Sequence, residues 1–291
     1  MADFSTAWNK IVTVYSPGSG TGKSEIAASL GYILGKKGKK VWIIDANMFA
    51  PTLDIVFNIP IDDRKTLSEF ILNERLSAIP LCDISHVLKS RSGGRLFFTP
   101  SMRNDVERRS RLEEVLIDSE TVCEKIPKAI FNGMGNGIDY LIIDTHPGFE
   151  RINQVWLGIT KYLLIVSRIT DADIGNLKVL LKDKDLLDIP RKLVIFNNVC
   201  LTEERDPRMT MKNRKMMNRF LSLLQNPPEF LGTPGGDGTD IEIFPRAIPY
   251  SKSLACHDGS TGLYIRSHTK STFAFIMRAL AEKIAHDLNE E

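Results

Sequence analysis

The sequence predicts one α/β domain built on a doubly wound, mainly parallel sheet of about seven strands flanked by helices. Three observations support this prediction: short apolar runs recur along the chain, helical segments alternate with them, and a glycine-rich turn directly follows the first run. Strands buried on both faces of a parallel sheet need near-continuous apolar residues. Alternating strands and helices are typical of a sheet covered by helices on both faces.

The elements follow in order along the chain. After the first run, apolar residues recur at helical spacing, and Gly38 behind two lysines marks the end of that helix. The same alternation continues to a final helix expected at 272–288, which favours one domain over residues 1–291. The Pro- and Gly-rich segment 225–240 is interpreted as a surface loop inside this domain. The runs expected as strands are 11–15, 41–44, 96–99, 140–143, 162–166, 193–196 and 241–248.

The composition is that of an ordinary folded protein. With 291 residues, 43% of them hydrophobic and 25% charged, the chain can bury a large core. A net charge of +2 gives no overall case for nucleic acid or membrane, so such a partner would need a local patch. The four cysteines form no CxxC pair, which favours a reducing, cytoplasmic setting over a zinc site or disulfides. The chain has no run of 18 apolar residues, so no transmembrane segment is predicted.

A phosphate-binding loop is predicted directly after the first strand. Residues 16–24 read Ser-Pro-Gly-Ser-Gly-Thr-Gly-Lys-Ser and lead into a helix, which disfavours a chance glycine-rich turn. Small residues let backbone N–H groups point inward, and the helix amino terminus adds positive potential. Lys23 would reach the β and γ phosphates, and the Ser24 hydroxyl would bind magnesium. Pro17 replaces the first glycine of GxxxxGK[ST]. The expected phosphate contacts are Gly18, Ser19, Gly20, Thr21, Gly22, Lys23 and Ser24.

Two aspartates are expected beside this loop. Asp45 ends the second predicted strand, and Asp144 ends the run at 140–143. The carboxyl ends of parallel strands meet at the crevice where such sheets bind ligands, and carboxylates there hold magnesium directly or through water. Either aspartate alone is also compatible with a helix cap or a turn. Together with the loop they predict a metal site made by Ser24, Asp45 and Asp144.

These motifs together resemble the ParA/MinD branch of the P-loop ATPases, which has a deviant phosphate loop. The family patterns Lys-Gly-Gly-x-Gly-Lys-[Ser/Thr], Asp-x-Asp with Pro-Ser-Leu, and Asp-x-Pro-x-Gly fall on 18–24, 45–53 and 144–148, and a strand-then-Pro segment falls on 98–101. The resemblance implies a P-loop NTPase fold that binds ATP or ADP with Mg²⁺ and forms an ATP-dependent homodimer. It also implies that Asn197 contacts adenine and that Pro249 lies beside the base.

Two residues depart from the family pattern. Gly18 stands where the family has its signature lysine, which reaches the phosphates of the partner subunit, and Asn47 stands where it has a second aspartate near the attacking water. Gly18 removes a cation that would stabilise developing phosphoryl charge. Asn47 can orient a water but cannot accept its proton. With Lys23, Asn47 and Asp144 as the expected catalytic residues, we expect nucleotide binding with slow hydrolysis.

The resemblance leaves several functions open. The leading hypothesis is a nucleotide-dependent dimerising switch that positions an unknown cargo such as a chromosome, plasmid, division or pilus component. The alternative is a pseudo-ATPase scaffold that binds ATP or ADP without significant turnover. A bacterial tyrosine kinase type ranks last because the carboxyl tail has no tyrosine cluster, and missing cysteine pairs disfavour iron–sulphur relatives. His146 either senses the γ phosphate or, as we favour, points to solvent.

One local patch is a candidate partner site. Segment 205–219 holds six Lys or Arg and one Asp, with methionines near one helical face. Such a helix could bind anionic lipid, DNA or an acidic protein, although a surface helix packing its apolar face on the sheet is the favoured interpretation. The acidic end of the final helix differs from the basic tail of MinD, so MinD-type anchoring is not expected. The expected location is cytoplasmic, with peripheral contact at membrane or nucleoid left open.

Overall fold

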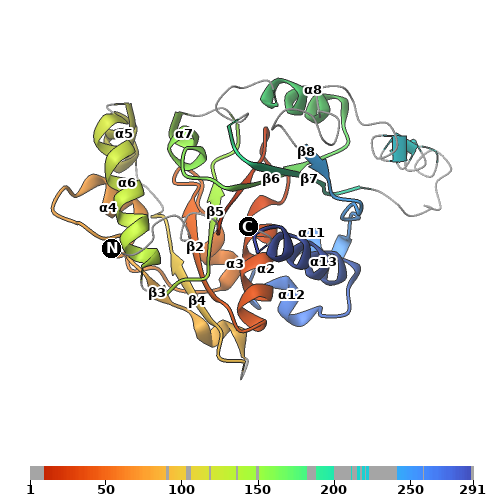
Figure 1. Cartoon of the computed structure of the whole chain (residues 1–291), viewed down its shortest axis with the longest axis horizontal. Helices are drawn as coiled ribbons and strands as arrows, with labels where there is room; N and C mark the ends of the chain where they lie inside the picture. Colours follow the sequence, from red (N-terminus) through yellow and green to blue (C-terminus); the bar gives the residue numbers. More distant parts are fainter. Residues whose placement is uncertain are drawn as a thin grey trace.

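A computed structural model describes residues 10–89, 92–102, 106–117, 119–135, 137–148, 151–181, 188–199, 241–257 and 259–289, with isolated positions between 211 and 222. Its centre is an eight-stranded sheet (Figure 1). The strands are β1 Ile11–Tyr15, β2 Lys40–Ala46, β3 Cys82–Asp83, β4 Arg95–Thr99, β5 Tyr140–Thr145, β6 Tyr162–Ser167, β7 Arg191–Phe196 and β8 Ile241–Ile243. They lie in the order β3-β4-β2-β5-β1-β6-β7-β8.

The predicted α/β fold is confirmed. Every neighbouring pair of these strands is parallel except β3 with β4. All residues of β1, β5 and β6 are buried, as a parallel sheet covered on both faces requires. β1 lies between β5 and β6, so the chain reverses its direction of winding at β1. The carboxyl end of β1 is therefore the point where such sheets bind ligands.

Helices cover both faces of the sheet (Figure 1). On one face, α2 and α13 pack on Val12 and Val14 of β1, and on the other α4 to α7 pack on Ile11 and on Trp42 of β2. Helix α8 covers β6 and β7. The helices are α2 Lys23–Lys36, α3 Leu53–Phe57, α4 Leu67–Leu72, η1 Ser85–Leu88, α5 Val106–Ile117, α6 Ser119–Met134, α7 Arg151–Leu157, α8 Asp171–Leu180, α11 Lys252–Ala255, α12 Tyr264–Ser267 and α13 Thr272–Asp287.

The structure corrects two details of the predicted sheet. The run at 241–248 is not one strand, because β8 ends at Ile243 and Pro245 has no backbone N–H to donate. The chain rejoins β7 where Ile248 N donates to Phe196 O at 2.8 Å. β3 was not predicted, since two residues carry no readable alternation. The predicted end of the first helix is confirmed, with α2 ending at Lys36 and Gly38 at φ 89°.

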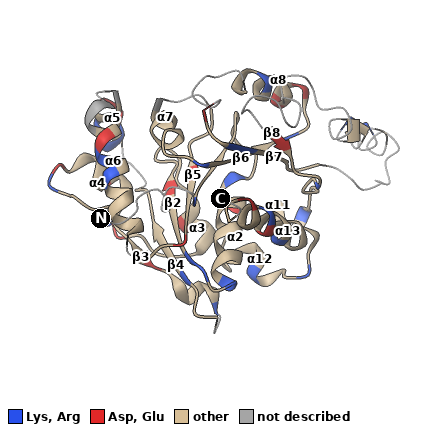
Figure 2. Ribbon diagram, in the orientation of Figure 1, with Lys and Arg blue, Asp and Glu red and all other residues tan. Residues whose placement is uncertain are grey.

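Charged residues are interspersed over the described surface. Figure 2 shows Lys and Arg together with Asp and Glu on the longer helices α2, α5, α6, α8 and α13. The loop at 225–240 and most of the basic segment 205–219 lie outside the described residues. Among the described helices, none is both long and apolar enough to cross a membrane.

Candidate functional site

The loop between β1 and α2 wraps around the end of Lys23. The Lys23 side chain is 7% exposed, and its Nζ donates to Ser16 Oγ at 3.1 Å. Gly20 and Gly22 adopt φ of 68° and 87°, values that side-chain-bearing residues rarely reach. Gly22 is also the N-cap of α2, so the free backbone N–H groups of that helix begin here. The loop therefore has the backbone that phosphate binding requires.

Asn197, which follows β7, is hydrogen-bonded to the phosphate-binding loop. Its Nδ2 donates to Thr21 O at 2.7 Å, and its Oδ1 accepts from Asn198 N at 2.8 Å. A Cβ at Gly22 would lie 2.4 Å from Asn197 Nδ2, so this close approach requires glycine. The sequence predicted an adenine contact for Asn197. The contact that the structure gives it is with the phosphate loop.

Asp45 and Asp144 lie opposite each other on the neighbouring strands β2 and β5. Asp45 accepts three backbone N–H groups, from Asn47 at 3.1 Å, Thr52 at 3.2 Å and Leu53 at 3.1 Å. These bonds fold the loop after β2 around the carboxylate. Asp144 is fully buried, and neither of its oxygens has a hydrogen-bond partner among the residues that the structure describes. The two aspartates are therefore brought together as predicted, but only Asp144 has both oxygens unpartnered.

Burial sets the protonation of these groups. It lowers the pKa of Lys23, while the Asp144 and Asp45 carboxylates oppose that shift. Burial and the neighbouring Asp144 raise the pKa of Asp45 well above its usual range. Burial raises the pKa of Asp144 to about 6. The Lys23 ammonium and the nearby Ser24 hydroxyl act in the opposite direction and lower this pKa. The Ser24 hydroxyl nevertheless makes no hydrogen bond of normal geometry to Asp144. Two buried carboxyl groups thus lie close to one buried ammonium group.

The residues present fit a magnesium ion. An unpartnered, buried carboxylate is costly unless a cation compensates it, and Asp144 is such a group. The Ser24 hydroxyl accepts from Thr52 Oγ1 at 3.0 Å and retains a lone pair. Mg²⁺ usually takes one or two carboxylates and completes its shell with water and substrate phosphates. Ser24 and Asp144 would hold the ion, and the ion would neutralise phosphate charge.

The side-chain amide of Asn47 has one polar atom without a partner among the described residues. Its Nδ2 donates to Ala50 O at 2.7 Å inside its own loop, whereas its buried Oδ1 has no partner. An unpartnered amide oxygen can accept a hydrogen bond from a water but cannot take the proton. The geometry agrees with the expected orienting role, which itself stays a prediction.

The loop after β5 is tied to the phosphate loop. Gly148 N donates to Ser16 O at 3.0 Å, and Gly148 O accepts from Tyr15 Oη at 2.6 Å. The His146 ring packs edge-on against Phe49, with ring centroids 5.7 Å apart, and its Nδ1 lies 2.8 Å from Pro147 O. The expectation that His146 simply points to solvent is therefore wrong, because the ring joins the loops after β2 and β5.

A cavity of about 330 Å³ opens beside the loop. Asn198 and Tyr250 line it, and Pro249 is not among its described lining residues although it pairs with Val199. Asn197 also lines this cavity, and the expected contacts of Asn197 and Pro249 with the base stay predictions. Its described lining residues are Gly20, Gly22, Glu25, Asn197, Asn198, Tyr250, Leu254, Ala255, His257 and Phe273.

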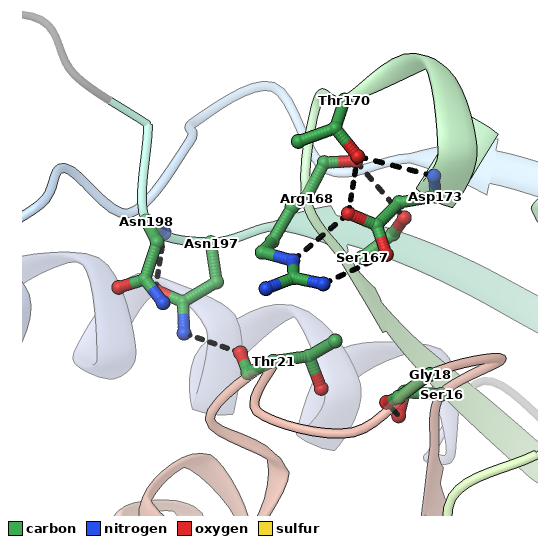
Figure 3. A network of polar contacts seen from close by, with 9 residues as sticks. All are labelled: Ser16, Gly18, Thr21, Ser167, Arg168, Thr170, Asp173, Asn197 and Asn198. Carbon is green, nitrogen blue, oxygen red and sulfur yellow. Dashed lines mark hydrogen bonds and ion pairs between the residues drawn. The ribbon is translucent and has the colours of Figure 1, made fainter.

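Sequence reasoning missed two charged residues next to the loop. Arg168 directly follows β6, and Asp173 lies in the first turn of α8. Figure 3 shows both beside the loop residues Gly18 and Thr21. The Thr170-x-x-Asp173 spacing is a readable capping signal, because Asp173 N donates to Thr170 Oγ1 at 3.1 Å. Nothing in the local sequence, however, reveals that β6 lies next to β1.

Proteins that hold such a loop between a central buried strand and a helix, with strand-end carboxylates beside its lysine, are P-loop nucleotide-binding proteins. The sequence pattern of the AAA domain family AAA_31 matches residues 9–196, and the chain belongs to that family. Its relatives make it a ParA/MinD-like member of the P-loop ATPases.

Three curated relatives are similar in sequence. The flagellum site-determining protein YlxH of Helicobacter pylori is 26% identical over 64% of this chain and 58% of its own length. The septum site-determining protein MinD of Thermotoga maritima is 27% identical over 56% of this chain and 55% of its own. A putative tyrosine-protein kinase, CapB of Staphylococcus aureus, is 28% identical over 63% and 72%. The chain thus spans less than two thirds of the first two relatives.

Solved structures confirm the fold. The cell division ATPase MinD of Pyrococcus furiosus has a TM-score of 0.65 at 16% identity and covers 96% of this chain and 99% of its own. MinD of Pyrococcus horikoshii complexed with Mg-ADP has a TM-score of 0.63 at 15% identity, covering 94% and 95%. The structure of pNOB8 ParA bound to nonspecific DNA has a TM-score of 0.58 at 17% identity, covering 97% and 99%.

Proposed function

We propose that this protein binds ATP with Mg²⁺ and acts as a nucleotide-dependent dimerising switch that positions a cellular cargo, with slow hydrolysis. The observation that carries the proposal is the buried Lys23 in a glycine-rich loop, directly beside the unpartnered carboxylate of Asp144. Lys23 and the loop N–H groups supply contacts for phosphate, and Asp144 with Ser24 supplies contacts for the metal.

The relatives support a positioning role. The names of YlxH and MinD describe proteins that determine the site of a flagellum and of a septum. One MinD structure is a complex with Mg-ADP, which supports nucleotide and magnesium as the ligands. ParA bound to nonspecific DNA supports a nucleoid contact as one option for the basic segment 205–219. We assign the protein to the cytoplasm, with peripheral contact at nucleoid or membrane.

The binding site is tested by Lys23→Ala. Loss of the buried ammonium removes hydrogen bonds to charged phosphate oxygens, each worth about 1.5–3 kcal/mol, so affinity for ATP and Mg²⁺ should fall about 10- to 150-fold. Isothermal titration calorimetry measures the change. Lys37→Ala is the matched control, since Lys37 follows the other end of the same helix and pairs with the exposed Glu282. Equal affinity in wild type and Lys23→Ala would contradict the assignment of the nucleotide site to this loop.

Slow hydrolysis is distinguished from a pseudo-ATPase scaffold by single-turnover phosphate release. Asn47 keeps a free Oδ1 that can orient water, which favours slow turnover over none. Purified protein in excess over labelled ATP should release phosphate over hours, at a rate above the spontaneous background. Phosphate release at the background rate, in a protein that still binds nucleotide, would instead support the pseudo-ATPase scaffold.

A further inference from the structure

Arg168 and Asp173 form a bidentate ion pair where β6 ends. Arg168 Nε donates to Asp173 Oδ2 at 2.8 Å, and Nη2 donates to Oδ1 at 3.2 Å. Thr170 Oγ1 donates a further bond to the same carboxylate. The Asp173 side chain is only 4% exposed, whereas that of Arg168 is 39% exposed. The carboxylate is therefore fixed in place, and the guanidinium lies at the surface of the site.

This pair adjoins the start of the phosphate loop. β1 and β6 are neighbours in register, Tyr15 beside Ile165, so the residues after each strand emerge side by side. A Cβ placed at Gly18 would lie 3.6 Å from Asp173 Oδ1. In Figure 3 the guanidinium of Arg168 extends over the loop between Asn197 and Asp173. Gly18 has no side chain to separate the pair from the loop.

The chemistry of this pair suits a competing anion. A guanidinium has five N–H donors in a fixed plane, and Asp173 takes two of them. Arginine binds carboxylates and phosphates with the same bidentate geometry, so a phosphate and Asp173 are alternative partners. Hydrogen bonds from Arg168 and Thr170 outweigh burial and keep the pKa of Asp173 below its usual range, so the carboxylate is an ionised competitor near neutral pH.

We propose that Arg168 is a phosphate-contacting residue of the nucleotide site, and that Asp173 holds its guanidinium and competes for it. The proposal rests on the proposed nucleotide binding and adds a second cation to Lys23. When nucleotide binds, Arg168 exchanges part of its pairing with Asp173 for a phosphate oxygen. Asp173 then sets the affinity by retaining the guanidinium and by placing a negative charge next to the loop.

Two single variants separate this proposal from a simple structural pair. Arg168→Gln removes the cation and should weaken ATP–Mg²⁺ binding at least about tenfold, as expected for a lost bond between ionised groups. Asp173→Asn keeps the side-chain shape and frees the guanidinium, so binding should tighten about threefold or more. A pair that only braces α8 would change affinity in the same direction in both variants, and that result would overturn the proposal.

The double variant Arg168→Gln with Asp173→Asn tests whether Arg168 only neutralises Asp173. If Arg168 contacts phosphate, the double variant should bind more weakly than Asp173→Asn and than wild type. Recovery of wild-type affinity would mean that Arg168 acts by screening alone, and it would overturn the proposal. This is a double-mutant cycle on two residues in direct contact.

Calorimetric titration with ATP and Mg²⁺ is run on the full chain, with thermal unfolding as the check on folding. Arg95→Gln and Asp83→Asn are matched controls, since they break an Arg–Asp pair at the opposite end of the sheet and should leave affinity unchanged. Arg168→Lys retains charge and should recover part of the affinity. Loss of binding in Lys23→Ala with none in Arg168→Gln would refute this inference alone. No effect of Lys23→Ala would refute the site itself.

Discussion

Asn47 and Gly18 stand at the two positions where the sequence motifs predict a departure from the family pattern. Asn47 Nδ2 donates to Ala50 O, and its buried Oδ1 has no hydrogen-bond partner among the described residues. Gly18 does not adopt positive φ, unlike Gly20 and Gly22, so its backbone accepts a side chain. The Cβ of a lysine introduced there would lie 3.6 Å from Asp173 Oδ1. Apart from those of its chain neighbours, no other described atom would lie within 4 Å of it. Position 18 can therefore carry a side chain, whereas Asn47→Asp removes the donor to Ala50 O.

The first residue-scale prediction is that Gly18→Lys with Asn47→Asp accelerates ATP hydrolysis. The carboxylate can accept the proton of the attacking water, and general base catalysis contributes about 10²–10⁴-fold. Nucleotide affinity should change by less than about tenfold, since neither residue belongs to the contacts of Lys23 and Ser24. Steady-state phosphate release and titration measure both effects. A wild type as fast as ordinary ATPases of this family would contradict the prediction.

Asp144 gives the second residue-scale prediction. Asp144→Ala should weaken ATP binding in the presence of Mg²⁺ much more than in EDTA, because its unpartnered carboxylate serves the ion. Titrations with and without EDTA measure the difference. Asp139→Ala is the control at the other end of the same strand, where Asp139 only accepts Lys40 N at 2.7 Å. Equal losses with and without metal would instead indicate a structural role for Asp144.

The residues of the phosphate loop were predictable because a motif in a short stretch of chain defines them. Lys23, Ser24 and Asp144 lie together as the sequence indicated. Arg168 and Tyr250 were not found, because their place beside the loop depends on which strands are neighbours. A single sequence does not state that β6 lies next to β1 or that Ile248 rejoins β7.

At the scale of elements, helix packing depends on glycine at one close approach. Gly133 of α6 lies against the fully buried Trp42 of β2, whose Nε1 donates to Thr99 Oγ1 at 2.8 Å. A Cβ at Gly133 would lie 2.6 Å from the indole ring. The indole is fully buried and fixed by this hydrogen bond, so it has little room to move away. The helix therefore sits at a distance from the sheet that only glycine permits.

Gly133→Ala should accordingly destabilise the fold by about 1–3 kcal/mol through overpacking. The control is Gly175→Ala in α8, where a Cβ would meet nothing within 4 Å. That change should stabilise by up to about 1 kcal/mol, because alanine favours helix over glycine. The midpoints of urea unfolding measure both changes in stability, provided that the slope of the unfolding free energy with urea concentration is the same in all variants. Equal effects of the two substitutions would show that the contact with Trp42 is unimportant.

The strands themselves were largely predictable, because burial on both faces leaves a continuous apolar run. β1 and the final helix α13 agree with the expected ranges to within one residue. The end of β8 was mistaken because Phe244 and Ile248 are apolar as well, and Pro245 alone interrupts the pairing. The two-residue β3 could not be predicted from the sequence, because its position depends on the antiparallel contact with β4.

At the scale of the whole molecule, the basic segment is the candidate surface for a large partner. Its described residue Arg219 pairs with Asp171, the first residue of α8, and Met211 is 76% exposed. Elsewhere on the described surface, acidic residues lie among the basic ones (Figure 2). Segment 205–219, with six Lys or Arg and one Asp, would therefore offer a polyanion a local concentration of positive charge.

We predict salt-sensitive binding of DNA or anionic vesicles that is lost in Arg214→Glu with Lys215→Glu. Co-sedimentation at low and high salt measures it. Reversal of two basic residues that each pair with a glutamate of their own helix, Arg109→Glu with Lys128→Glu, should leave binding almost unchanged. If the wild type sediments with neither partner at low salt, segment 205–219 is ordinary surface.

The two outermost strands limit how copies of this protein can associate. β3 has two residues and β8 has three, so the sheet presents few unpaired backbone groups at either described edge. Long exposed edge strands recruit further strands and lead to fibrous aggregation, and short ones prevent it. Many copies can therefore be concentrated at one place in a cell without their sheets joining. The nucleotide-dependent dimerisation that we propose would require this protection, because it has to be reversible.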